Sequence, residues 1–95
     1  MWYHLSQIKG LHYLGICCRQ RPTVGRGRSD CVYIGTLTYI NDQYAKYAPP
    51  GKYFLYAVDV TGLPVEKGTL PGEQMRCWGD IPEDHVSFIK EMVIK

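Results

Sequence analysis

Residues 52–60, KYFLYAVDV, are the stretch that most narrows the possible folds of this chain. The segment is rich in aromatic and β-branched side chains and has turn-forming residues on both sides, which is the pattern of a β-strand. Immediately before it, Pro49-Pro50-Gly51 ends any preceding helix, because proline cannot continue the helical hydrogen-bond ladder. A helix before Pro49 is therefore expected to end there, and a strand is expected to begin after Gly51.

Other strand-like segments lie on both sides of this one. They are expected at residues 2–5, 31–34, 74–78 and 85–95. The last segment is the least regular, because residues 86–88 alternate as in a strand while residues 89–93 also fit a helix. We interpret the tail as a strand that extends the sheet.

Two helices are expected between these strands. The first covers residues 8–14, with Ser6 as a candidate N-cap and Gly15 as its end. The second runs from Thr36 or Thr38 to Ala48. The segments between the elements, residues 17–30 and 61–73, hold most of the remaining Gly and Pro and are interpreted as connections. Because strands and helices do not alternate regularly, the predicted class is α+β, with small split antiparallel β-sheets and one or two helices.

The composition indicates one folded domain, residues 1–95. Apolar residues make up 45% and charged residues 21% of the chain, which is typical of a globular domain and not of a disordered segment. The apolar runs are too short to span a bilayer, and Met1-Trp2-Tyr3-His4 does not resemble a signal peptide. A cytoplasmic protein is therefore expected.

The cysteines, the histidines and the net charge bear on whether the chain binds a metal or a nucleic acid. The chain has four cysteines and three histidines: Cys17, Cys18, Cys31, Cys77, His4, His12 and His85. None of the cysteines forms a Cys-x-x-Cys pair, so reduced thiols and no metal site are expected. A net charge of +2 does not by itself indicate nucleic-acid binding.

Residues 31–48 contain four of the eight tyrosines: Tyr33, Tyr39, Tyr44 and Tyr47. Two interpretations are open. Tyrosines on an amphipathic helix are commonly half-buried core residues, and the same rings can also line a cleft that binds a flat ligand. The tyrosines alone do not decide between these possibilities.

Several short motifs occur in a characteristic order. They are Tyr3-His4, VYIG at 32–35 after a Gly- and Arg-rich loop, the Tyr-rich helix, LYAVDVTGLP at 55–64, and EQMRCWGDIPEDHV at 73–86. This order, which covers nearly the whole chain, resembles ADP-ribosyltransferases of the poly(ADP-ribose) polymerase and diphtheria-toxin type. The resemblance implies a minimal version of that fold, NAD as a co-substrate, and a glycosyltransferase that transfers ADP-ribose to a protein or nucleic-acid acceptor. The small size fits a bacterial or phage effector.

The resemblance also implies roles for individual residues. His4 would fix a ribose hydroxyl of NAD, and Tyr33 would stack on the nicotinamide together with Tyr44 or Tyr47. The physical reason is that nicotinamide in NAD is a flat cation, which is attracted to the electron-rich face of a phenol ring.

The catalytic carboxylate is the position at which this chain departs from the family. Counting back from the GDIP turn places Gln74 where the family has its Glu, and Glu73 precedes it. Met75 and Cys77 are expected in the core, so strand alternation predicts that Gln74 lies on the opposite, cleft-facing side with its neighbours Arg76 and Trp78. Three possibilities stay open: catalysis with Gln74, catalysis with Glu73 through a bulge, or binding without turnover.

The arginine-rich loop permits further alternatives. Arg19 and Arg21 are candidates for binding the pyrophosphate of NAD, because guanidinium groups match phosphate oxygens. The same arginines also suit a nucleic-acid partner or a solvated loop. The alternatives to a transferase are therefore a non-catalytic module that binds NAD, ADP-ribose or a partner protein, and a small RNA- or DNA-binding protein.

Overall fold

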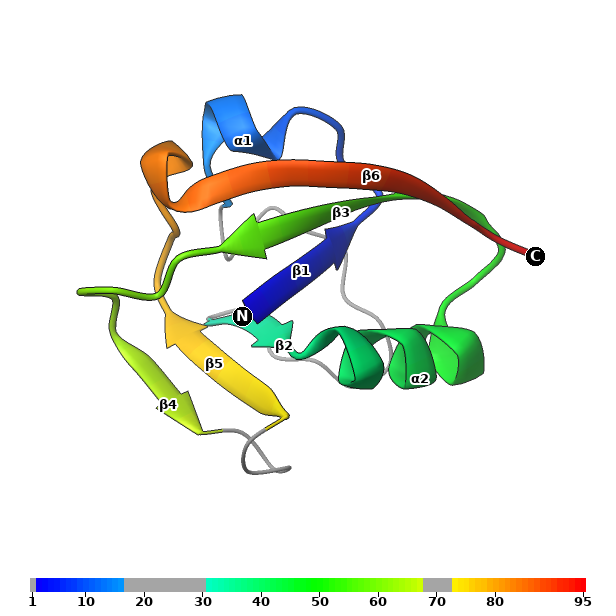
Figure 1. The fold of residues 1–95 in the computed structure, drawn as a ribbon, viewed down its shortest axis with the longest axis horizontal. Coiled ribbons are helices and arrows are strands. Elements are labelled where there is room, and N and C mark those ends of the chain that lie inside the picture. The colour runs from blue at the N-terminus through cyan, green and yellow to red at the C-terminus, as the bar shows by residue number, and fades with distance from the viewer. Residues whose placement is uncertain (1, 17–30, 68–72) are drawn as a thin grey trace.

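The structure, a computed structural model, describes residues 2–16, 31–67 and 73–95 (Figure 1). In chain order the elements are β1 (Trp2–Ser6), α1 (Leu11–Leu14), β2 (Cys31–Gly35), α2 (Leu37–Tyr47), β3 (Gly51–Val58), β4 (Val65–Lys67), β5 (Gln74–Trp78), the 3₁₀ turn η1 (Glu83–His85) and β6 (Val86–Ile94). The described residues form a six-stranded antiparallel sheet with two α-helices, which confirms the predicted α+β class.

The predicted strands are all present, including the tail, which forms β6 over nine residues. Strand β4 was not predicted, because it is only three residues long and lies in a segment rich in Gly and Pro. The side chains that pack best in a pleated sheet, aromatic and β-branched ones, dominate β3 and explain why its pattern was the clearest.

The two helices begin differently from one another. Of the two predicted caps of α2, Thr36 and Thr38, the structure has Thr36, whose Oγ1 accepts a hydrogen bond from the backbone N–H of Tyr39 (3.3 Å). Ser6 does not cap α1. Its Oγ accepts from the N–H of Ile8 (3.0 Å) in the connection after β1, and the helix begins after Gly10, which has a φ of 84°.

The strand order in the sheet is β4-β5-β2-β1-β3-β6. Strand β1 pairs with β3 over five residue pairs, and β2 pairs with β5 over five. The junction between β1 and β2 is much shorter, with a single pair, Tyr3 with Gly35. The described strands form one continuous sheet, so the prediction of small split sheets was wrong. We call the short junction between β1 and β2 the β1–β2 seam.

Two apolar clusters cover the two faces of the sheet. The cluster with α1 contains Leu11, Ile16, Val32, Ile34, Phe54, Tyr56, Val58, Cys77, Ile81 and Val86, and the cluster with α2 contains Leu5, Ile40, Tyr53 and Leu55. Because neighbouring side chains on a strand point to opposite faces, alternate residues of β3 belong to different clusters. We call the two sides of the sheet the α1 face and the α2 face (Figure 1).

Neither of the two described α-helices is long and apolar enough to cross a membrane.

Candidate functional site

Strands β2 and β5 bring the candidate residues together on the α2 face. Gln74 lies opposite Gly35 in the register of these strands, and Arg76 lies opposite Tyr33. Cys77 is fully buried in the cluster on the other face, and Met75 packs against that cluster. The predicted alternation of β5, with Gln74, Arg76 and Trp78 away from this core, is therefore confirmed.

Tyr39 is the residue of this site that sequence reasoning missed. The Gln74 carboxamide Nε2 donates a hydrogen bond to the Tyr39 hydroxyl at 2.6 Å, and Gln74 is only 7% exposed. The Tyr39 ring lies against Gly35, where an added Cβ would be 2.5 Å from Tyr39 Cδ1. Two features of the sequence could have indicated this contact. Gly35 at the end of the strand leaves room for a ring, and the capping threonine that follows it puts Tyr39 in the first turn of the helix.

The groups around Tyr39 change the pKa of its phenol. Burial raises the pKa of Tyr39 above its ordinary value, the neighbouring Tyr33 phenol raises it further, the hydrogen bond from Gln74 lowers it, and the Glu73 carboxylate raises it slightly. Glu73 is also fixed by its backbone, because its carbonyl oxygen accepts from the N–H of Thr36 (2.9 Å). We call Tyr33, Tyr39, Glu73 and Gln74 the tyrosine–carboxamide cluster.

His4 lies next to this cluster but faces the other way. It is 4% exposed, and the register of β1 and β3 places it opposite Tyr56, on the α1 face. Its Nδ1 donates to the backbone carbonyl oxygen of Tyr33 at 2.9 Å, across the β1–β2 seam. His4 and Tyr33 therefore meet through the backbone of Tyr33, while the imidazole and the phenol lie on opposite faces of the sheet and do not line one groove, contrary to what the resemblance implied.

The structure does not describe the side chains of four predicted binding residues. Arg19 and Arg21 lie outside the described residues. Tyr44 and Tyr47 lie on α2, and the described part of the structure does not include their side chains.

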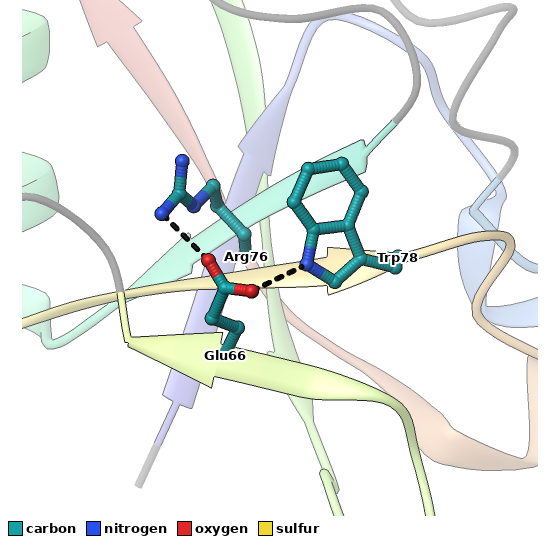
Figure 2. A network of polar contacts seen from close by, with 3 residues as sticks. All are labelled: Glu66, Arg76 and Trp78. Carbon is teal, nitrogen blue, oxygen red and sulfur yellow. Dashed lines mark hydrogen bonds and ion pairs between the residues drawn. The ribbon is translucent and has the colours of Figure 1, made fainter.

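A second group of polar side chains lies where β4 meets β5 (Figure 2). Glu66 of β4 accepts from Arg76 Nη2 through Oε1 (2.8 Å) and from Trp78 Nε1 through Oε2 (3.2 Å). The Arg76 guanidinium carbon is 5.8 Å from the centroid of the Trp78 ring, within the range of a cation–π contact. We call Glu66, Arg76 and Trp78 the β4–β5 network.

Among residues 2–16, 31–67 and 73–95, no group of three or more His, Cys, Asp and Glu side chains is arranged to hold a metal ion. The chain matches no family model, no curated protein and no solved structure. The geometry of the two groups of side chains is therefore the basis for a functional proposal.

Proposed function

We propose that this chain is an NAD-dependent ADP-ribosyltransferase built on a minimal ADP-ribosyltransferase-like fold. The observation that carries the proposal is the tyrosine–carboxamide cluster. It gathers a phenol from β2, a phenol from the first turn of α2, and a carboxylate and a carboxamide at the start of β5, beside the strand that bears His4.

These residues fit a nicotinamide nucleotide chemically. A pyridinium ring is flat and cationic, and a phenol face attracts such a ring by about 0.5–1 kcal/mol when exposed and by about 2 kcal/mol when desolvated. Tyr33 and Tyr39 are close enough for one phenol to affect the ionisation of the other. In the proposal both contact the nicotinamide end of NAD, and Tyr39 takes a role that the resemblance gave to a later tyrosine of the helix.

Glu73 is the residue that we assign to charge stabilisation. Departure of nicotinamide leaves positive charge on the ribose, and a carboxylate facing that charge lowers the barrier. The resemblance puts Gln74 where the family has its Glu, but the carboxamide of Gln74 is neutral and already donates to Tyr39. In the proposal, Gln74 therefore positions the Tyr39 hydroxyl. The exposed carboxylate of Glu73 stabilises the positive charge on the ribose.

His4 acts in this proposal as a positioning residue. Its ring is buried and bound to the Tyr33 carbonyl, so it supports the segment of β2 that carries the Tyr33 phenol. A direct contact between His4 and a ribose hydroxyl, as the resemblance implied, is not part of the proposal.

The test is the release of nicotinamide from NAD, measured by chromatography on the purified protein. We expect release by the wild type, a fall of at least about tenfold in Glu73→Gln, and a smaller fall in Gln74→Ala. Glu91→Gln is the control, because Glu91 is an exposed carboxylate on β6 that pairs only loosely with Lys52 (3.7 Å). Equal rates in Glu73→Gln and Glu91→Gln would remove the assignment of Glu73.

A binding module without turnover is the second candidate, and the neutral side chain of Gln74 favours it. It predicts that NAD or ADP-ribose raises the melting temperature while no nicotinamide appears. A ligand-induced shift that is lost in Tyr33→Ala, in the absence of any release, would support this candidate over the transferase.

A further inference from the structure

Strand β6 forms one border of the sheet (Figure 1). The strand order ends in β4 on one side and in β6 on the other, and β6 pairs with β3 alone among the described strands. Strand β4 has three residues, whereas β6 has nine. The backbone N–H and C=O groups on the outer side of a border strand can pair with a strand of another molecule. Of the two borders of this sheet, β6 is the one long enough for such pairing.

The second half of β6 is the regular part of this border. The register with β3 shifts beside Ile89, and each of residues 90–94 again has one partner on β3. Helix α1 contacts the first half of the strand, where the His12 ring stacks on Phe88 with 5.6 Å between the ring centroids. Farther along, the Val93 side chain is 65% exposed. Residues 90–94 contain neither a proline nor a bulge, the features that most often block the pairing of a border strand.

The pairing with β3 also shows which side chains of this segment share a face. Glu91 lies opposite Phe54, which belongs to the cluster on the α1 face. Because alternate side chains of a strand share a face, Val93 and Lys95 are on the α1 face as well. The α2 face carries two apolar side chains of this segment, which pack against the cluster there: Met92 and Ile94.

The charges of this segment restrict how two copies of it can pair. Two identical strands pair antiparallel about a two-fold axis perpendicular to the sheet, and this symmetry brings residues of the same face opposite one another. An axis at Lys90 or at Glu91 would place like charges directly opposite each other, which is unfavourable. An axis at Met92 would place each of these charged residues opposite an apolar one.

An axis at Val93 gives a self-complementary pairing. Val93 then lies opposite the same residue of the second copy, and Met92 lies opposite Ile94. Glu91 lies opposite Lys95, and the symmetry makes two such ion pairs, one on each side of the axis. Opposite charges and apolar pairs across two strands both stabilise the pairing. Residues 91–95 therefore match a second copy of themselves.

We infer that two copies of this chain associate through the second half of β6, antiparallel about Val93, so that their sheets join into one. The loose ion pair of Glu91 with Lys52 (3.7 Å) is kept, because Lys52 belongs to β3, on the other side of β6. The net charge of +2 per chain is small, so the two copies repel each other weakly. The inference does not depend on the proposed function, because β3 and β1 separate β6 from the strands of the tyrosine–carboxamide cluster.

The test is an exchange of charges, measured by sedimentation equilibrium over a series of protein concentrations. We expect the wild type to dimerise. Glu91→Lys and Lys95→Glu are each expected to raise the dissociation constant at least about tenfold, because each variant places like charges opposite each other twice. The double variant Glu91→Lys/Lys95→Glu restores the opposite charges, so its dissociation constant is expected to lie within about threefold of the wild-type value. This recovery also shows that loss of the dimer in the single variants is not a folding defect.

Lys90→Glu is the matched control for the charge exchange. Lys90 is an exposed charge of the same strand, but it lies opposite Leu55 on the α2 face and outside the paired residues 91–95. We expect its reversal to leave the dissociation constant within about threefold of the wild-type value. A wild type that stays monomeric at every concentration overturns the inference, and this is the result expected if β6 pairs with a strand of a different protein. A dimer that both single charge reversals leave unchanged overturns it as well.

A cross-link on the axis tests the register directly. Opposite residues of an antiparallel pair have Cα atoms about 4.5–5.5 Å apart, within the range that a disulfide spans. Under mild oxidation, Val93→Cys is therefore expected to join two copies through position 93, and mass spectrometry of the linked peptides identifies this bond among those of the other cysteines. Lys90→Cys is expected to form at least about tenfold less of the corresponding bond. Equal linkage at positions 90 and 93 would overturn the register.

Discussion

Tyr39 connects a helix and two strands through one side chain. Its hydroxyl accepts from Gln74 of β5, and its ring packs over Gly35 of β2. Tyr33 and Glu73 influence its ionisation. Substitutions of this residue therefore report on the whole tyrosine–carboxamide cluster.

Removing the hydroxyl of Tyr39 tests the hydrogen bond to Gln74. We expect Tyr39→Phe to lower the free energy of unfolding by about 1–2 kcal/mol, because the nearly buried carboxamide loses this acceptor. Urea denaturation measures the change. Tyr13→Phe is the control, since Tyr13 is an exposed residue of α1. Equal stability of the two variants would contradict the expectation.

The phenol of Tyr39 also makes stability depend on alkaline pH. Its pKa in the folded protein is raised above 10.0, mainly by burial, so the folded state keeps this proton to higher pH than the unfolded chain. The stabilising contribution is complete below pH 10 and is lost as pH rises through the folded-state pKa. We expect the free energy of unfolding of the wild type to fall more steeply above pH 10 than that of Tyr39→Phe. Parallel pH curves for the two proteins would contradict this. Tyr53, whose pKa burial also raises, contributes equally to both.

At the scale of elements, the end of β2, the start of α2 and the start of β5 converge on Gly35. An added Cβ there would lie 2.8 Å from the Glu73 carbonyl oxygen as well as 2.5 Å from the Tyr39 ring. The backbone oxygen cannot move away cheaply, because it accepts the hydrogen bond from Thr36. Only glycine allows these three elements to approach this closely.

A methyl group at this junction is therefore expected to separate the elements. Gly35→Ala should destabilise the fold by about 1–3 kcal/mol, which is typical of overpacking, and should weaken any NAD-induced rise in melting temperature. Thermal denaturation with and without NAD measures both effects. A variant that melts like the wild type in both conditions would show that the junction has more room than the structure indicates.

Helices and strands could be predicted where the sequence pattern that specifies them lies within one short segment of the chain. The strand pattern of residues 52–60 and a threonine cap at residue 36 or 38 need only neighbouring residues, and the structure has the strand and the cap at Thr36. The three-residue strand β4 has too short a pattern to detect. The contact between Tyr39 and Gln74, and the face on which His4 lies, depend on strand pairing between distant segments, and the sequence alone does not specify that register.

At the scale of the whole molecule, Tyr56 joins the connection after β1 to strand β3. It is fully buried on the α1 face. Its hydroxyl donates to the carbonyl oxygen of Ile8 (2.8 Å) and accepts from the N–H of Leu11 (3.3 Å). The short helix α1, with four residues, is too short to be stable by itself, so this anchoring holds it against the sheet.

Loss of this hydroxyl should loosen α1 specifically. We expect Tyr56→Phe to lower the free energy of unfolding by about 1–3 kcal/mol and to speed hydrogen exchange in residues 11–14. Tyr53→Phe is the matched control, because the Tyr53 hydroxyl donates to Pro49 on the other side of the molecule (2.8 Å). Equal exchange rates for residues 11–14 in both variants would contradict this role of Tyr56.

The β1–β2 seam divides the sheet into two three-stranded ribbons, β4-β5-β2 and β1-β3-β6. Many residue pairs join the strands within each ribbon, whereas one residue pair and the bond from the His4 imidazole to the Tyr33 carbonyl are described across the seam. The apolar cluster on the α1 face packs Val32 and Ile34 of one ribbon together with Phe54 and Tyr56 of the other. Side-chain packing therefore joins the two ribbons where strand pairing is sparse.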